Sequence, residues 1–441
     1  MRNPILATLL ASAFLTMNAN ATDLLQIYKD ALANDAQYAS ARASLTAGQE
    51  KPVQGRAALL PGIALRGSGT KSNTEVESDQ IAGSRTLKGV GNTWTLALSQ
   101  PLFNWGNWQQ YEQSKLSLLV SDAQFAQARQ DLIVRVAQAY FDVLAAQDTL
   151  ETLRAQKSAI SEQLASAKRN FEVGTSTITD THEAQARYDL VTAQEFAGQS
   201  DLQVKRAALQ QIIAKEAGEL APLRAGVKLN APQPALIDDW VSSAEKQNFG
   251  VVASQVAVEI AKREIQKSRA GHFPTVDLVA STGRSSNAGA GNPAGTGVSR
   301  PTTIGLQWNV PIFSGFSVDS RVRESIALED KARSDYENAR RTAAQGARQA
   351  FVGVNSGLAQ VKAYEAAEIS SQSALESNKL GYQVGVRINI DVLNAQQQLY
   401  TTRQTLAKAR YDTILNGLRL KSASGNLKEE DLAEVNSLLQ H

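Results

Sequence analysis

Two short segments, Phe171-Glu-Val-Gly-Thr-Ser-Thr-Ile-Thr-Asp180 and Tyr382-Gln-Val-Gly-Val-Arg-Ile-Asn-Ile-Asp391, carry the same pattern in the two halves of this chain. Each segment interrupts a very long helical pattern, and a short strand-like stretch precedes that pattern in both halves. A unit that recurs in a fixed order indicates an internal repeat, which decides how the rest of the chain is interpreted. The sequence therefore predicts a fold with two-fold pseudo-symmetry.

The helical pattern before each segment is unusually long. Between Trp105 and Phe171, apolar residues such as Leu132 and Val136 recur at steps of three and four, which is the spacing of one helix face. About 67 residues at 1.5 Å each would span roughly 100 Å. A helix of that length does not fit a compact domain, so we expect the helices to pack side by side as coiled coils.

The predicted organisation follows from these patterns. Repeat 1 covers residues 22–230, with a helix, a β-hairpin at about 61–102, a long helix at about 105–171 and a helix at about 179–215. Repeat 2 covers residues 231–441, with a helix, a β-hairpin at about 274–313, a long helix at about 318–380, a helix at about 390–422 and a C-terminal tail.

Each long helix should end in a tight turn that starts the next helix. Gly174 and Gly385 suit the left-handed position that follows a helix C-terminus. Ser176 or Thr177 in the first turn, and Asn389 in the second, are residue types that cap a new helix. Thr177 with Asp180 three residues later also resembles a capping box.

The strand-like stretches alternate with period two, as in 303–310, which is typical of strands of a membrane barrel. Four prolines bound these stretches, and we expect them to lie at the junctions of strands and helices: Pro61, Pro101, Pro274 and Pro311. Residues 72–91 and 285–301 are rich in Gly, Ser, Asn and Thr, and we expect them to form long polar hairpin loops. Four strands per chain cannot close a barrel, and lipid does not tolerate open sheet edges, so the strand count predicts a homo-oligomer, with a trimer as the smallest open pore.

The N-terminus predicts export from the cytoplasm. Arg2, a mostly apolar stretch at 5–17 and the small residues at 19–21 form a signal peptide that ends at residue 21. The chain has no cysteine, which excludes a disulfide scaffold and a cysteine nucleophile. No segment of the predicted mature chain approaches the length of an apolar membrane helix.

Other functional classes find little support in the sequence. Basic and acidic residues are mixed and nearly balanced, so no face for nucleic acid is predicted. The three histidines, His182, His272 and His441, lack metal-ligand spacing, and no phosphate loop or nucleophile elbow is present, which speaks against an enzyme, a metal site or a cofactor. A periplasmic coiled-coil structural or adaptor protein stays open as an alternative, although it would not need the strands.

The chain resembles the TolC family of outer-membrane efflux and secretion channels. The resemblance covers essentially the whole mature chain and rests on the segments 171–180, 272–283 and 381–393. It implies an α+β membrane protein in which a homotrimeric 12-stranded outer-membrane β-barrel, with four strands per chain, continues into a long α-helical coiled-coil barrel across the periplasm. It also implies an equatorial strap, formed by residues 219–249 and the tail from Ser424.

The resemblance further implies partners and a role. Such a channel lies in the outer-membrane lipid of a Gram-negative bacterium. A periplasmic adaptor and an inner-membrane efflux pump or ABC exporter open it, and it exports small molecules or proteins, as in type I secretion. It is a passive duct without a cofactor.

Residue roles also come from the resemblance. Tyr382 and Arg387 match the tyrosine and arginine of the second tip, and Thr179 and Asp180 match the residues that they bond in the first tip, so these four form the expected periplasmic gate. From the residues alone, Asp180 can equally be a helix cap and Arg387 a solvated turn residue.

A further pair belongs to the pore. Asp391 matches the pore-lining aspartate at the constriction, where three copies would form a cation-attracting ring. The family has a second aspartate one helical turn further on, and this chain has Asn394 at that position, which weakens the expected cation selectivity. From the residues alone, Asp391 can also be a first-turn carboxylate that the helix dipole favours.

Overall fold

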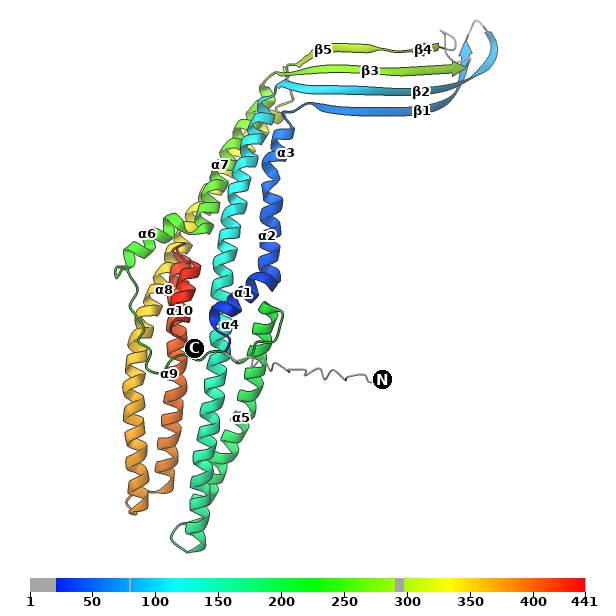
Figure 1. Cartoon of the computed structure of the whole chain (residues 1–441). Coiled ribbons are helices and arrows are strands. Elements are labelled where there is room, and N and C mark those ends of the chain that lie inside the picture. Colours follow the sequence, from blue (N-terminus) through cyan, green and yellow to red (C-terminus); the bar gives the residue numbers. More distant parts are fainter. Residues whose placement is uncertain (1–20, 79–80, 290–296, 441) are drawn as a thin grey trace, which may run out of the picture.

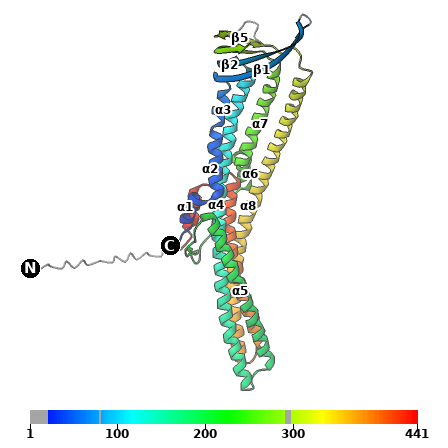
Figure 2. The same cartoon turned by 90° about the vertical axis from the view of Figure 1, so that its right-hand side faces the viewer.

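The structure is a computed structural model that describes residues 21–78, 81–289 and 297–440. Residues 1–20 of the predicted signal peptide therefore lie outside the described residues. The molecule is elongated, with a long sheet at one end and two helical hairpins reaching to the other end (Figure 1). A view turned by 90° shows that the helices stay bundled along the whole length (Figure 2).

The helices after each hairpin follow the predicted order, whereas the single helix predicted before each hairpin is divided, among the described residues, into three helices in the first half and into two helices and a 3-10 turn in the second. In the first half they are α1 Leu24–Asn34, α2 Ala36–Gln49, α3 Lys51–Ala57, α4 Trp105–Glu172 and α5 Ile178–Ile213. In the second half they are α6 Ile237–Gln247, α7 Phe249–Arg269, the 3-10 turn Ala270–His272, α8 Ser317–Gln383, α9 Asn389–Ala423 and α10 Glu429–Asn436. The two long helices, α4 and α8, have 68 and 67 residues, as their unbroken three-and-four spacing requires.

The sheet is antiparallel and joins the two halves. Its strands are β1 Gly62–Ser78, β2 Ile81–Phe103, β3 Thr275–Gly289, β4 Gly297–Ser299 and β5 Thr302–Asn309. β4 and β5 pair with successive parts of β3, so together they fill one position and the sheet has the order β1, β2, β3, β4/β5. Within the described residues, β1 pairs only with β2 and β5 only with β3, so each outer strand has one edge without a partner.

The predicted polar loops are wrong in extent. β1 and β2 pair residue by residue from Gly62 opposite Ser99 to Val76 opposite Arg85, through most of the predicted loop 72–91. β3 likewise continues to Gly289, inside the predicted loop 285–301. Gly and Asn indicated loops because they are depleted in strands, but cross-strand pairing overrides this weak preference, and Thr itself favours strands.

The two faces of the sheet differ in character. One row across the strands is apolar, and the adjacent row, on the opposite face, is small or polar. The apolar row is Ile63, Leu98, Ala280 and Ile304, and the adjacent row is Ala64, Ala97, Ser281 and Thr303. This alternation is the pattern of a strand with lipid on one side and water on the other.

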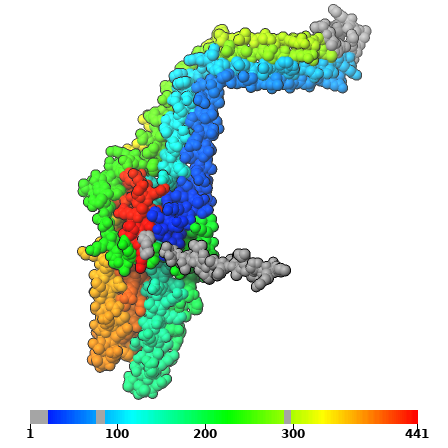
Figure 3. Space-filling view, in the orientation of Figure 1, coloured from blue at the N-terminus to red at the C-terminus, as the bar shows by residue number. Residues whose placement is uncertain are grey.

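The main hydrophobic core lies midway along the helices. Tyr140 and Phe141 of α4 are fully buried there, together with Tyr411 of α9 and residues of α1. The terminal helix α10 (red) packs beside α1 (dark blue) at this level (Figure 3). Both ends of the described chain therefore lie in one band around the middle of the long helices. We call this band, formed by α1, α10 and the core around Tyr140 and Tyr411, the belt. The helix α6, within the predicted strap, packs mainly on α8, where Trp240 lies in a separate small cluster with Val354 and Leu420.

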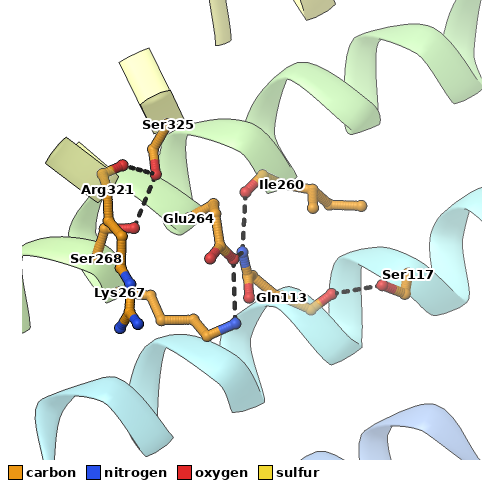
Figure 4. A network of polar contacts seen from close by, with 8 residues as sticks. All are labelled: Gln113, Ser117, Ile260, Glu264, Lys267, Ser268, Arg321 and Ser325. Atoms are coloured by element: carbon orange, nitrogen blue, oxygen red, sulfur yellow. Dashed lines mark hydrogen bonds and ion pairs between the residues drawn. The ribbon is translucent and has the colours of Figure 1, made fainter. Parts of the chain in front are cut away.

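Polar contacts join the helices between the belt and the sheet. The buried amide of Gln113 on α4 donates to the main-chain oxygen of Ile260 at 3.2 Å and to Glu264 of α7 at 2.7 Å (Figure 4). The hydroxyls of Ser268 and Ser325, 2.8 Å apart, connect α7 to α8. Because a buried polar group costs free energy unless it is paired, these contacts fix how the three helices align.

Among the described residues, no helix is both long enough and apolar enough to cross a bilayer.

Candidate functional site at the helical tips

The two tips have nearly identical turns. α4 ends at Glu172 and α8 at Gln383, and the glycines that follow, Gly174 and Gly385, have φ of +77° and +80°. A residue with a Cβ is strained in this region, so glycine is the residue that allows the chain to reverse here. The prediction for both glycines is confirmed.

The first tip is capped as the sequence predicts. The Thr177 hydroxyl accepts a hydrogen bond from the amide of Asp180, and the Asp180 carboxylate accepts from the amide of Thr177 at 3.1 Å, which is a capping box. The hydroxyls of Ser176 and Thr177 donate to the same carboxylate oxygen at 2.9 and 3.0 Å. Asp180 is therefore held by its own turn, and Thr179 lies exposed beside it.

The second tip differs from its prediction at one residue. Ile388, not Asn389, occupies the cap position of α9, and no side chain caps this helix. Asn389 is instead the first helical residue and only 1% exposed. It is turned toward the first hairpin, where Gln163 donates to its oxygen at 2.5 Å and its own amide donates to the main-chain oxygen of Asp180 at 3.1 Å.

The four expected gate residues do not bond one another directly in the described chain. The hydroxyl of Tyr382 accepts a hydrogen bond from Asn170 of α4 at 3.3 Å. Arg387 forms an ion pair at 3.6 Å with Asp391, one turn along in α9. Tyr382 therefore does contact the first hairpin, but through Asn170, whereas Arg387 contacts its own hairpin.

A groove brings three of these four residues together. It has a volume of about 780 Å³, and Asp180, Tyr382 and Arg387 all line it, while Thr179 is not in its lining. Asn170 and Asn389 line the same groove. The site is thus a cleft between the tips of the two hairpins, with a carboxylate on one side and a guanidinium on the other.

The predicted constriction pair lies just above this groove on α9. Asp391 and Asn394 line a second groove of about 500 Å³, together with Arg387. The oxygen of Asn394 accepts a hydrogen bond from Arg187 of α5 at 3.0 Å. The one carboxylate of the pair and its amide neighbour therefore each face an arginine.

The junction prolines lie where the sheet meets the helices. Pro61 and Pro274 directly precede β1 and β3, and Pro311 follows β5. Pro101 is an exception, because it lies inside β2, at a register shift between Pro101 and Phe103. A strand tolerates proline at such an irregularity, where the missing N–H removes no ladder hydrogen bond.

Sequence reasoning missed the amides and one arginine of this site. Gln163, Asn170 and Arg187 lie on polar stretches of long helices, where a solvated side chain and a contact residue look alike. The sequence pointed to such contacts only through the three amide side chains at positions 389, 394 and 397 of α9. No group of three or more His, Cys, Asp or Glu residues suited to a metal ion occurs within the described ranges.

Known proteins with similar sequences are outer-membrane proteins and secretion proteins. The sequence model of the outer membrane efflux protein family matches residues 27–215 and 240–426, one stretch in each predicted repeat. The chain is 35% identical to the outer membrane protein TolC of Vibrio cholerae, over 95% of this chain and 94% of that protein. It is 33% identical to the alkaline protease secretion protein AprF of Pseudomonas aeruginosa, over 98% and 90%.

A solved structure shows the same fold. The crystal structure of the outer membrane protein VceC from Vibrio cholerae superimposes with a TM-score of 0.76 at 20% identity, covering 91% of this chain and 96% of VceC. The expected channel fold, the outer-membrane location and the role in efflux are confirmed, and the alternative of a periplasmic coiled-coil structural or adaptor protein is not supported. By its sequence and its fold, the chain belongs to the outer membrane efflux protein family.

Proposed function

We propose that three copies of this chain form a passive duct that carries cargo across the periplasm and the outer membrane. The sheet is the observation that carries this proposal. One of its faces is apolar, and β1 and β5 each leave an edge without a partner in the described chain. Since lipid cannot satisfy open edges, neighbouring copies have to pair with them, and four strand positions from each of three copies give a barrel wide enough for a pore.

The helical tips are the gate in this proposal. Asp180 of the first tip and Arg387 of the second tip line the same 780 Å³ groove, so closing the groove would bring a guanidinium onto a carboxylate. Such charge-assisted bonds contribute only about 1.5–3 kcal/mol each, so a docking partner can break them. Asp391 and Asn394 lie next along α9 and would form the constriction, with Asp391 attracting cations.

The partners are a periplasmic adaptor and an inner-membrane efflux pump or ABC exporter. The partner supplies the energy, and the chain itself performs no enzymatic step and uses no cofactor. Two relatives are an alkaline protease secretion protein and a proteases secretion protein, which supports secreted proteins as one cargo class. Small molecules are the other class, which the efflux family supports.

Single-channel conductance in a planar bilayer tests the duct and its gate together. We expect a small, steady conductance for the wild type and a several-fold larger one for Arg387→Ser. Arg341→Ser is the matched control, because Arg341 is exposed on α8 and pairs with Glu337 of its own helix. A wild type that is already wide open would remove Arg387 as a gate residue, and inserted oligomers that never conduct would refute the channel.

A further inference from the structure

The apolar face of the sheet has a limited height. The sheet extends away from the helices (Figure 1), and no charged residue occurs among the described positions of this face between the rows of Trp308 and Trp94. On β3, Val276 lies opposite Trp308, and Arg284, eight positions later, lies opposite Trp94. This stretch spans roughly 27 Å along the strand, or about 20 Å of height at the usual strand tilt of about 40°. That height approaches the apolar band of about 25 Å that aromatic residues flank on membrane barrels, so the two tryptophans mark the edges of the band.

Four basic residues begin where this band ends. Arg284 is the cross-strand neighbour of Trp94, and Lys71 and Lys88 lie on the same face two and three rows further out. Arg300 lies between β4 and β5, which pair with β3 in one continuous register, so it continues the row of Arg284. All four residues are exposed, and we call them the basic rim.

The opposite face of the sheet has no such concentration of charge. From the row of Arg66 outward, Arg66 is the one basic residue among the described side chains of that face. On the face of the basic rim, Glu75 is the one acidic residue among the described side chains beyond Trp94. The positive charge therefore lies on the side that the proposed duct turns to lipid, where it cannot act on cargo in the pore.

The position of the basic rim indicates what it binds. Side chains just outside the apolar band lie at the depth of lipid headgroups, where arginine and lysine bind phosphate. In the proposed duct the helices occupy the periplasm, so the far end of the sheet lies in the outer leaflet. The main lipid of that leaflet in Gram-negative bacteria is lipopolysaccharide, which bears phosphates on its acylated sugars and further anionic groups on the sugars beyond them. The basic rim extends over several rows in the same outward direction.

We propose that the basic rim binds lipopolysaccharide of the outer leaflet. Arg284 and Arg300, level with Trp94, bind the phosphates of its acylated sugars, because a guanidinium can bind two phosphate oxygens at once. Lys71 and Lys88 lie further out, level with the anionic sugars that follow. This inference rests on the proposed function, which sets the orientation of the barrel, and adds a lipid partner outside the pore.

Binding of lipid to the purified oligomer tests this proposal. The probe is a short lipopolysaccharide that keeps its phosphates but lacks the outer sugars, added in detergent without divalent cations and followed by calorimetry. Replacing all four residues of the basic rim with glutamine should weaken binding at least about tenfold, since each basic residue near an anionic lipid surface contributes separately. Arg284→Gln alone should weaken binding several-fold. Arg66→Gln is its matched control, because it removes an arginine from the opposite face of the same sheet and should bind like wild type.

A second measurement needs no variant. Wild type should bind the same lipid several-fold more weakly after its phosphates have been removed. It should also bind phosphatidylglycerol more weakly, because that headgroup bears a single phosphate and no charged sugars. Equal binding of the phosphate-free lipid or of phosphatidylglycerol would overturn lipopolysaccharide as the partner.

The outcomes separate this inference from the proposed function. Single-channel conductance is measured on the same preparations, and the variant with all four substitutions should form oligomers that conduct like wild type. If wild type conducts but this variant binds the lipid as tightly as wild type, the inference is overturned and the duct stands. If wild type binds the lipid and this variant does not, yet inserted oligomers never conduct, the duct is refuted and the lipid site stands.

Discussion

Arg187 on α5 donates a hydrogen bond to the side-chain oxygen of Asn394 on α9 over 3.0 Å, so a positive charge lies beside the predicted constriction. Asp391, one turn away, forms an ion pair with Arg387 at 3.6 Å. The predicted constriction therefore combines one carboxylate and one amide with two arginines. This arrangement predicts weaker cation selectivity than two free carboxylates would give.

Substitution of Asn394 tests this electrostatic arrangement. Asn394→Asp places a carboxylate next to Arg187, so the hydrogen bond becomes an ion pair in which both partners are charged. We expect a lower conductance and only a small gain in cation selectivity, because Arg187 neutralises the new charge. Adding Arg187→Gln should release that charge and raise the selectivity further, measured as the reversal potential in a salt gradient. Equal reversal potentials for the single and double variants would contradict a role for Arg187.

An arginine substitution should be harmful on the apolar face of the sheet and tolerated on the polar face. Ile304 is 78% exposed on the apolar face, and Ile304→Arg should cost about 2–4 kcal/mol if this position lies near the middle of the bilayer. Thr303→Arg is the control, since the neighbouring side chain points to the polar face. The measurement is the fraction of heat-resistant oligomer recovered in membranes. Similar losses for both variants would mean that the faces are assigned incorrectly.

Acid should weaken the attachment of the C-terminal helix. Arg129 and Tyr28 both donate to the Glu429 carboxylate, at 2.7 and 3.1 Å, and the hydrogen bond from Arg129 is the main cause that lowers the pKa of Glu429 below 4.5. A lowered pKa adds stability above pH 4.5 that is lost as the pH falls through the folded-state value.

Hydrogen exchange of α10 measures this effect. In the wild type, exchange in residues 429–436 should accelerate below pH 4.5 more than its ordinary pH dependence accounts for. Glu429→Gln cannot ionise, so its protection should be lower at neutral pH and change less with acid. Parallel pH profiles for the two proteins would exclude Glu429 as the group responsible.

The effect of pH on stability that comes from Asp148 should have the opposite sign. Burial raises the pKa of its carboxyl above 3.8, and the buried Tyr411 hydroxyl donates to it at 2.6 Å. A raised pKa gives stability that is complete below pH 3.8 and is lost as the pH rises through the folded-state value. At neutral pH the charged form is therefore a cost to the fold.

Asp148→Asn removes that cost and keeps an acceptor for Tyr411. We expect its thermal unfolding midpoint in detergent to exceed that of the wild type at pH 7, and the difference to vanish below pH 3.8. Tyr411→Phe is the companion variant, since it leaves the buried carboxylate without its donor and should lower the midpoint. A lower midpoint for Asp148→Asn at neutral pH would show that the charge itself stabilises the belt.

Much of the architecture can be predicted from the sequence because local patterns specify it. The three-and-four spacing between Trp105 and Phe171 already indicates a helix that ends next to Gly174, and α4 ends at Glu172. Thr177 and Asp180 predict their capping box, because such a cap involves only residues of one turn. The extent of the strands was less predictable, since a strand becomes stable only when its partner is present.

The sequence by itself determined the repeat, the long helices, the glycine turns and, through the family resemblance, the kind of protein. Only the tertiary structure decided which residues meet across the tips. Asn389 and Gln163 are 226 positions apart, and their 2.5 Å bond exists because two hairpins pack together. Helix periodicity and turn chemistry act over a few residues and are therefore visible in the sequence, whereas the partner of a polar side chain depends on packing between distant segments.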